Sequence, residues 1–208
     1  MRPPKSHLRQ NIESIALALV VALLVRSSVV EAFWVPSGSM LPTIQIGDQL
    51  FVNKLAYAVR VPLLGTKLFN TGSVQRGEIV VFVSPVDGQD LIKRVVAIAG
   101  DTVEIRDKRL LVNGQAAADT YAQFSDRHHK DAPRDRYGPA VVPAGKFFVL
   151  GDNRDQSYDS RYWGFADVEE IKGRAMFIYF SWDTKNCWPS WTHLQCGPRW
   201  GRLGHVLR

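Results

Sequence analysis

The chain has 208 residues, of which 46% are hydrophobic and 22% are charged, and it carries a formal net charge of +6. This length suits one domain with an appendage and is enough to bury a real core. The positive charge favours an anionic partner, but no block of lysine and arginine resembles a nucleic-acid-binding arm. We therefore expect a membrane surface as partner and no nucleic acid.

The N-terminus begins with a basic segment, in which Arg2, Lys5 and Arg9 occur without an acidic residue. Uninterrupted apolar residues follow from Ile15 to Val25, but as a helix they span only about 16 Å, short of the ~30 Å hydrocarbon core of a bilayer. Residues 12–31 approach the required length if the polar side chains near the ends reach water. This pattern predicts a cytoplasmic N-terminus over residues 1–11 and a transmembrane anchor over 12–31. A cleaved signal peptide is the alternative, although no small-x-small cleavage site follows promptly.

Residues 32–208 are predicted to form the extracytoplasmic domain, and their pattern beyond Thr43 is that of short strands. The candidate strands are rich in β-branched and aromatic residues and are bounded by glycine, proline, aspartate or asparagine. They are QLFVNKLAY, EIVVFVSPV, DLIKRVVAIAG, DTVEIRDKRLLVNG, KFFVLGD and RAMFIYFSW. Many brief strands with turn signals predict a mainly β fold, with antiparallel sheets in a coiled or barrel-like domain.

Within this domain, RDKRLLVNGQ reads as a hairpin that ends in an Asn-Gly turn. Residues 115–142 are polar and aperiodic, so we interpret them as an excursion from the core. Together these features predict a small accessory unit at about residues 104–143. Cys187 and Cys196 are the only cysteines, and the sequence leaves their pairing open.

The stretch PSGSMLPT, residues 36–43, places two hydroxyls within a stiff segment. Pro36 and Pro42 fix their own φ and push the preceding residues toward extended geometry. In an extended segment, Ser37 and Ser39 point to the same side. The stretch is therefore either a turn whose hydroxyls bond their own backbone or a nucleophile with a second hydroxyl beside it.

The stretch DLIKRVVAIAGD, residues 90–101, places two cations on opposite faces of one strand. The other residues on both faces are apolar, so at least Lys93 or Arg94 is expected in poorly hydrated surroundings. One interpretation is an edge strand whose cations reach water. The other is a neutral lysine that acts as a general base, because desolvation disfavours the charged amine.

The stretch GDNRDQSYDSRYWG, residues 151–164, combines acids and arginines that can pair within a rigid loop. A calcium loop does not fit, because Arg154 stands where an oxygen ligand is needed and no glutamate closes the loop. We expect no metal and no cofactor. A purely structural charged turn stays open for this stretch, and Ser157 would then be incidental.

A histidine-dependent serine triad does not fit the sequence. The histidines lie before the anchor, in the polar excursion and near the C-terminus, outside any stretch with a catalytic pattern. A serine nucleophile then needs another base, and a lysine is a known variant. An S-x-x-K spacing is absent after Ser39.

Taken together, these segments resemble the type I signal peptidases, the bacterial leader peptidases, which are serine proteases with a Ser-Lys dyad. PSGSMLPTIQIGD resembles the nucleophile box of that family, RGEIVVF the following strand, IKRVVAIAGD the lysine box and GDNRDQSYDSRYWG the last box. The segments occur in the order of the family and cover residues 34 to about 180.

The resemblance implies a role for each candidate residue. Ser39 would be the nucleophile and Lys93 the general base, while the Ser37 hydroxyl and the backbone N–H of Ser39 would form the oxyanion hole. Ser157 would orient Lys93 through a hydrogen bond. Four further residues would support the site, with Asp159 and Arg161 as an ion pair; the four are Asp152, Arg94, Asp159 and Arg161.

The resemblance also implies a substrate and a location. The substrates would be secreted preproteins with small residues at positions −1 and −3 of the cleavage site. The protein would be a single-pass protein of the bacterial cytoplasmic membrane with a periplasmic catalytic domain, and exposed apolar segments would rest on membrane lipid.

Three alternatives differ in class. A self-cleaving repressor-type Ser-Lys protease should be cytosolic and carry a DNA-binding domain in place of the anchor. A processing peptidase dedicated to a conjugation or pilus substrate is closer. A non-catalytic membrane-anchored β module that binds extended peptides would not need Ser39, Lys93 and Ser157 together.

Overall fold

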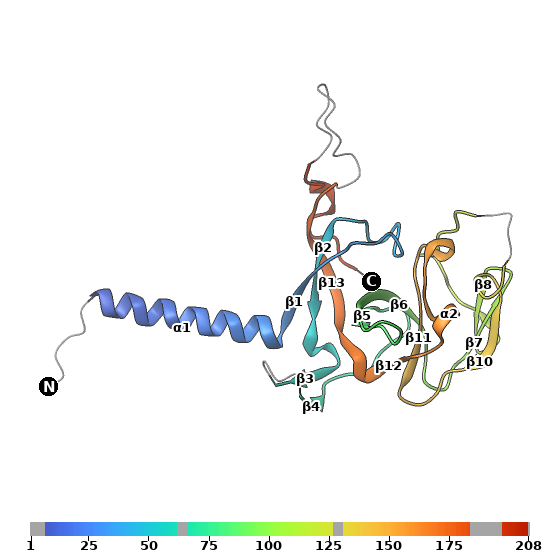
Figure 1. Ribbon diagram of the computed structural model, residues 1–208, viewed down its shortest axis with the longest axis horizontal. Coiled ribbons are helices and arrows are strands. Elements are labelled where there is room, and N and C mark those ends of the chain that lie inside the picture. The colour runs from blue at the N-terminus through green and yellow to red at the C-terminus, as the bar shows by residue number, and fades with distance from the viewer. Residues whose placement is uncertain (1–6, 62–65, 127–130, 184–196, 208) are drawn as a thin grey trace, which may run out of the picture.

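The structure is a computed structural model that describes residues 7–61, 66–126, 131–183 and 197–207. The first described element is a long helix, α1 (His7–Ser28), which leads into β1 (Val30–Trp34). Figure 1 shows α1 extending away from the β domain, and the side chains of residues 10–23 are all exposed. No helix in the described part of the chain is both long and apolar enough to cross a membrane. The structure therefore does not show the predicted anchor over residues 12–31.

The main body is a seven-stranded antiparallel sheet in the order β1-β2-β13-β5-β6-β11-β12. Beyond β1 its strands are β2 (Asp48–Asn53), β5 (Ile79–Val83), β6 (Asp90–Ile98), β11 (Lys146–Leu150), β12 (Ala166–Asp167) and β13 (Ile171–Ser181). The register shifts within the β13 pairings and between β11 and β6, and such bulges bend a sheet. The prediction of a mainly β, antiparallel fold is confirmed.

A second sheet packs beside the first, in the order β10-β7-β8-β9 (Figure 1). It consists of β7 (Thr102–Arg106), β8 (Arg109–Val112), β9 (Gln115–Ala116) and β10 (Tyr137–Val141). Asp107 and Lys108 take positive φ at the turn between β7 and β8, and Asn113 and Gly114 do so between β8 and β9. Positive φ at both central residues is typical of tight hairpin turns, so the Asn-Gly turn is present and a second turn precedes it.

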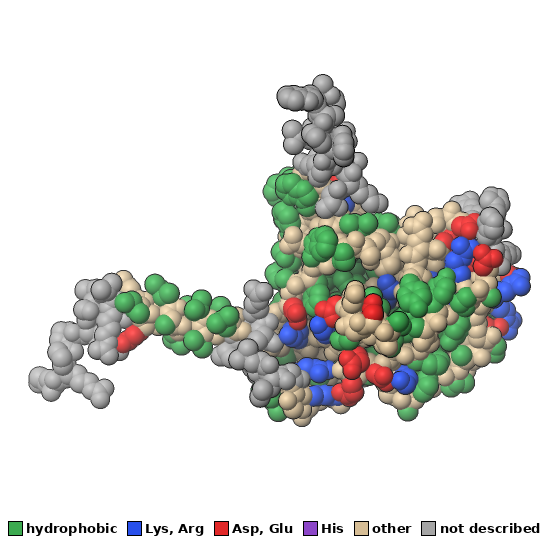
Figure 2. Space-filling model, viewed as in Figure 1, with side chains coloured by type: hydrophobic (Ala, Val, Ile, Leu, Met, Phe, Trp, Pro, Cys, Tyr) green, Lys and Arg blue, Asp and Glu red, His purple; other side chains and the backbone are tan. Residues whose placement is uncertain are grey.

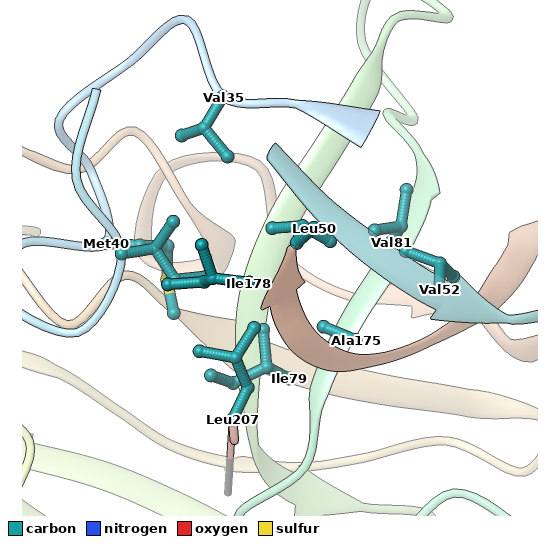
Figure 3. Close-up of a cluster of buried hydrophobic side chains, with 10 residues drawn as sticks. Val35, Met40, Leu50, Val52, Ile79, Val81, Ala175, Ile178 and Leu207 are labelled. Carbon is teal, nitrogen blue, oxygen red and sulfur yellow. The ribbon is translucent and has the colours of Figure 1, made fainter. Parts of the chain in front are cut away.

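A hairpin of β3 (Ala58–Arg60) and β4 (Lys67–Asn70) completes the described strands. The core consists of three clusters of buried side chains on the two faces of the large sheet. One of them includes buried side chains of the segment between β1 and β2, among them Met40 and Ile44 (Figure 3). A segment without regular structure is thus tied to the core at two points.

Strand β6 lies inside the large sheet, between β5 and β11. Lys93 is 3% exposed and Arg94 is 2% exposed. The interpretation of this stretch as an edge strand with both cations in water is therefore wrong. Both cations are buried because each face of the strand is covered by the core.

Candidate active site

The segment that carries Ser39 is a compact loop between β1 and β2. The backbone N–H of Leu41 donates to the carbonyl of Gly38, and that of Ile44 donates to the carbonyl of Met40. The buried side chains of this loop hold it against the sheet, whereas Ser39 is half-buried at its turn. The loop thus presents one hydroxyl at the edge of the core.

Ser39 meets Lys93 of β6 directly. Nζ of Lys93 donates a hydrogen bond of 2.6 Å to Oγ of Ser39. The two residues lie 54 positions apart in the sequence, and the loop and the strand bring them together. A hydroxyl and an amine at this distance can exchange a proton without an intervening water.

The environment of Lys93 favours the neutral amine. Burial lowers the pKa of Lys93 to about 8, because a charged ammonium is poorly solvated there. The negative charges of Asp159 and Asp152 act in the opposite direction, and the positive charge of Arg161 partly offsets them. No carboxylate of the described residues forms an ion pair with Lys93, so burial dominates.

Ser37 is exposed, and its Oγ lies 3.5 Å from Oγ of Ser39. Among the described residues, the backbone N–H of Ser39 donates to no other group. A hydroxyl and a backbone N–H that both lie beside Oγ of Ser39 are the two kinds of donor from which oxyanion holes are built.

The loop after β11 contacts the backbone of the loop that carries Ser39. The backbone N–H of Asn153 donates to the carbonyl of Ser39 at 3.0 Å, and its Nδ2 donates to the carbonyl of Gly38 at 3.0 Å. Gly151 packs so tightly that an added Cβ would overlap both the carbonyl of Ser39 and Oγ of Ser157. Only glycine fits this position, because its missing side chain allows the two loops to touch.

Ser157 lies in this loop and is 5% exposed. Its Oγ is buried and makes no hydrogen bond within the described structure, so the predicted hydrogen bond to Lys93 is not seen. The contact with Gly151 nevertheless places Ser157 beside the backbone of Ser39. A buried hydroxyl without a partner is costly, so it is expected to have a use in the working site.

Arg94 and Asp152 form a buried ion pair behind the site. Nε and Nη2 of Arg94 each donate to one oxygen of Asp152 at 2.8 Å, and Asp152 is 0% exposed. The hydroxyl of Thr43 donates to the same carboxylate at 2.6 Å. The carboxylate of Asp152, in the loop after β11, therefore binds both the loop that carries Ser39 and β6.

Asp159 and Arg161 form a second buried pair. Nε of Arg161 donates to Asp159 at 2.8 Å, and Asp159 also accepts from the backbone N–H of Gly151 at 3.0 Å. Arg161 belongs to the short helix α2 (Ser160–Trp163) and donates further to the carbonyls of Arg154 and Arg134. This pair holds the loop after β11 in its shape.

Sequence reasoning missed the residues of the polar stretch that hold this loop. The ring of Tyr121 lies 3.7 Å from the guanidinium carbon of Arg94. The backbone of Gln123 accepts from Arg154 and donates to Asp152, while Asp119 pairs with the side chain of Arg154. The stretch lacks periodicity because it supports a loop, and a pattern search has no signal for such contacts.

Potential metal ligands do not gather in the described part of the chain, where no group of three histidine, cysteine, aspartate or glutamate side chains could hold an ion. Cys187 and Cys196 lie outside the described residues, as do His128, His129 and His193. The described site therefore consists of hydroxyls, one amine and buried ion pairs.

The contact at Gly151 leads to a prediction. Gly151→Ala should lower peptide hydrolysis by on the order of 100-fold, because the new methyl group must displace Ser157 or the backbone of Ser39. Turnover of a fluorogenic peptide measures the loss, and circular dichroism checks the fold. Gly197→Ala is the matched control, since nothing lies within 4 Å of its added Cβ. Equal activity of the two variants would contradict this view of the contact.

Comparison with known proteins identifies the family. The family model described as signal peptidase, peptidase S26, matches residues 8–182. A signal peptidase I from Pseudomonas aeruginosa is 36% identical over 221 residues, which cover 90% of this chain and 75% of that protein. A signal peptidase I from Leptolyngbya laminosa is 38% identical over 183 residues, which cover 84% of this chain and 81% of that protein.

Two further matches are a curated relative and a solved structure. A signal peptidase I from Bacillus licheniformis is 33% identical over 181 residues, which cover 85% of this chain and 90% of that protein. The crystal structure of a signal peptidase I from Enterococcus faecalis matches with a TM-score of 0.42 and 34% identity, covering 49% of this chain and 96% of that chain. The predicted family and enzyme class are confirmed: the chain belongs to the signal peptidases of family S26.

Proposed function

We propose that this chain removes signal peptides from secreted preproteins, with Ser39 as the nucleophile and Lys93 as the general base. The observation that carries the proposal is the 2.6 Å contact between a buried amine and a half-buried hydroxyl. Burial keeps a useful fraction of Lys93 neutral near its pKa of about 8, and a neutral amine can accept the hydroxyl proton. A structural role alone does not account for a buried lysine whose hydrogen bond goes to a serine.

The reaction follows from this geometry. Neutral Lys93 takes the proton of Ser39 as Oγ attacks the carbonyl carbon before the scissile bond, and the tetrahedral oxyanion forms. The N–H of Ser39 and the hydroxyl of Ser37 stabilise that oxygen. Protonated Lys93 then gives its proton to the departing amine, which leaves the signal peptide esterified to Ser39. A water molecule that loses its proton to Lys93 hydrolyses this ester and restores the enzyme.

The remaining site residues act by position. The hydroxyl of Ser157, buried without a partner, orients the amine of Lys93 when the side chains adjust around substrate. The two ion pairs, Arg94 with Asp152 and Asp159 with Arg161, keep the surrounding loops rigid. The substrates carry small residues at positions −1 and −3, as the resemblance to the family implies.

We place the protein at the bacterial cytoplasmic membrane, with α1 in contact with lipid and the catalytic domain outside the cytoplasm. The large apolar side chains described between Ile12 and Leu23 of α1 are 50–68% exposed, and the β domain does not cover them (Figure 2). A surface of this kind is unfavourable in water and favours a lipid environment. The basic residues Arg2, Lys5 and Arg9 at the start of the chain support a cytoplasmic N-terminus.

A first test concerns the nucleophile. Ser39→Ala should abolish cleavage of a preprotein and leave the fold intact, because it removes one hydroxyl and little packing. Mass spectrometry of the wild-type protein treated with an acylating β-lactam or lactone should find the adduct at Ser39. An adduct at Ser37, or turnover that survives in Ser39→Ala, would overturn the assignment.

A second test concerns the base. The free enzyme needs neutral Lys93, so kcat/KM should rise with pH through about 8 and level off above it. Lys93→Met and Lys93→Arg should both be inactive, since neither side chain can accept the proton. A profile governed by a group near 6.5, and lost on replacement of a histidine, would contradict the mechanism.

The same depressed pKa links folding to pH. The unfolded chain binds a proton at Lys93 up to about pH 10.5, whereas the folded chain releases it near 8. The free energy of unfolding should therefore gain a contribution as pH rises from about 8 to 10.5, and should lose it again as pH falls from 10.5 to 8. Lys93→Met should remove this contribution in denaturant titrations at the two pH values.

A third test concerns the membrane. The full chain should co-sediment with vesicles that contain anionic lipid, and deletion of residues 1–28 should leave the protein in the supernatant. The deleted protein should still cleave a short peptide, because β1 and the site remain. Full-length Ser39→Ala is the matched control and should bind vesicles like the wild type. Recovery of the full chain in the supernatant would contradict the membrane assignment.

A further inference from the structure

The C-terminal arm, residues 198–207, lies against β13. The backbone N–H of Gly204 donates to the carbonyl of Ile178 at 2.8 Å, and that of Ile178 donates to the carbonyl of His205 at 3.0 Å. The N–H of Leu207 donates to the carbonyl of Met176 at 2.8 Å. Strand β2 pairs with one side of β13, and β5 pairs with the first residues of β13 on the opposite side. The arm lies beyond β5 along that opposite side. The arm is therefore fixed to the main sheet.

From this position the arm reaches the nucleophile loop, which is the segment 35–47 that carries Ser39. It does so through Arg202, in the short 3-10 helix Trp200–Arg202. Nη2 of Arg202 donates to Asp48 at 2.6 Å and to the carbonyl of Thr43 at 3.0 Å, and Nε donates to both oxygens of Asp48. Asp48 is 0% exposed and also accepts from Ser181 at 2.6 Å. Arg202 thus joins the start of β2 to the loop before it.

A second arginine contacts the same loop. Nη1 of Arg199 donates to the side chain of Gln45 at 2.6 Å, and Nη2 donates to the carbonyl of Ile46 at 2.6 Å. Backbone carbonyls in an irregular loop have no sheet partners, so these donors take the place of a sheet pairing. The two arginines together bind four residues of this segment, which are Thr43, Gln45, Ile46 and Asp48.

The arm also packs beneath the loop. Leu207 is 7% exposed and belongs to the same buried cluster as Met40 and Ile44. Figure 3 shows Leu207 close to Ile79 in the cluster that also contains Met40. Met40 directly follows Ser39, so the buried cluster to which the arm contributes Leu207 also includes the neighbour of Ser39.

The contacts of the arm are connected to the strand of Lys93 through Thr43 and Asp152. Thr43, whose carbonyl Arg202 holds, donates its hydroxyl to Asp152, and Asp152 pairs with Arg94 beside Lys93 on β6. The nucleophile loop is therefore held between the arm on one side and the strand of the base on the other. Without the arm, the loop would keep its contacts to β6, Asn153 and Trp182 but lose the donors that Arg199 and Arg202 supply to its second half.

We propose that Arg202 is a positioning residue for the reaction, which holds the nucleophile loop so that Oγ of Ser39 stays within reach of Lys93. This inference rests on the proposed function of Ser39 and Lys93. Arg202 contacts Thr43 and Asp48, so it acts through the loop and not on the substrate. A displacement of the reacting atoms by about 1 Å is enough to reduce a rate by on the order of 100-fold.

The test compares Arg202→Gln and Arg202→Lys with the wild type on a peptide substrate, at a temperature far below unfolding. Arg202→Gln should lower kcat by about 10- to 100-fold and change KM by less than about 2-fold, because the loss affects the chemical step. Arg202→Lys should restore part of kcat, since an ammonium still pairs with Asp48. The pH at which activity rises should stay near that of the wild type, because the surroundings of Lys93 are unchanged.

Arg106→Gln is the matched control. Arg106 is exposed and pairs with Glu104 on the second sheet, far in the sequence from the nucleophile loop. It should keep the wild-type kcat. If Arg202→Gln does not fold, Arg199→Gln decides, with an expected fall in kcat of several-fold. A folded Arg202→Gln with wild-type kcat, or with a loss no larger than its unfolded fraction, would overturn the proposal. Activity that survives in Ser39→Ala would instead refute the proposed function.

Discussion

The whole site depends on the burial of one amine. Lys93 lies in the interior of the sheet at 3% exposure, and burial lowers its pKa to about 8. In water the same amine would be charged at neutral pH and would have no lone pair for a proton. In the proposed mechanism the fold therefore creates the base by removing water, and the 2.6 Å contact places the hydroxyl of Ser39 beside it.

A buried lysine close to carboxylates stays without an ion pair only when those carboxylates pair with other cations. Arg94, on the opposite face of the same strand, is neutralised by Asp152 through two hydrogen bonds, and Asp159 is neutralised by Arg161. Loss of either partner would leave an unpaired buried charge, at a cost of roughly 3–5 kcal/mol. Asp152 and Asp159 are thus paired with arginines, and neither forms an ion pair with the amine of Lys93. Burial therefore remains the largest effect on the pKa of Lys93.

The roles of Ser39 and Lys93 are assigned through the family resemblance, because the local pattern of each stretch left a structural reading open. Ser39 is in a stiff stretch with two prolines, and Lys93 is in an apolar strand. The resemblance named Arg94 and Asp152 as supports, but neither their pairing nor the contacts of Arg202 could be predicted, because the partners lie far apart in the chain. Arg94 and Asp152 are 58 positions apart, and Arg202 and Asp48 are 154 apart. Tyr121 was missed for a related reason, since its stretch has no periodicity and only folding brings it onto Arg94.

The protonation of Lys93 can be measured without turnover. In Ser39→Ala, with lysine side chains labelled with ¹⁵N and Lys93 assigned by its loss in Lys93→Met, NMR can follow the titration of its amine. The account predicts a midpoint well below that of free lysine and near 8. A midpoint near 10.4 in the folded protein would contradict it, because a lysine that is charged at neutral pH cannot serve as the base.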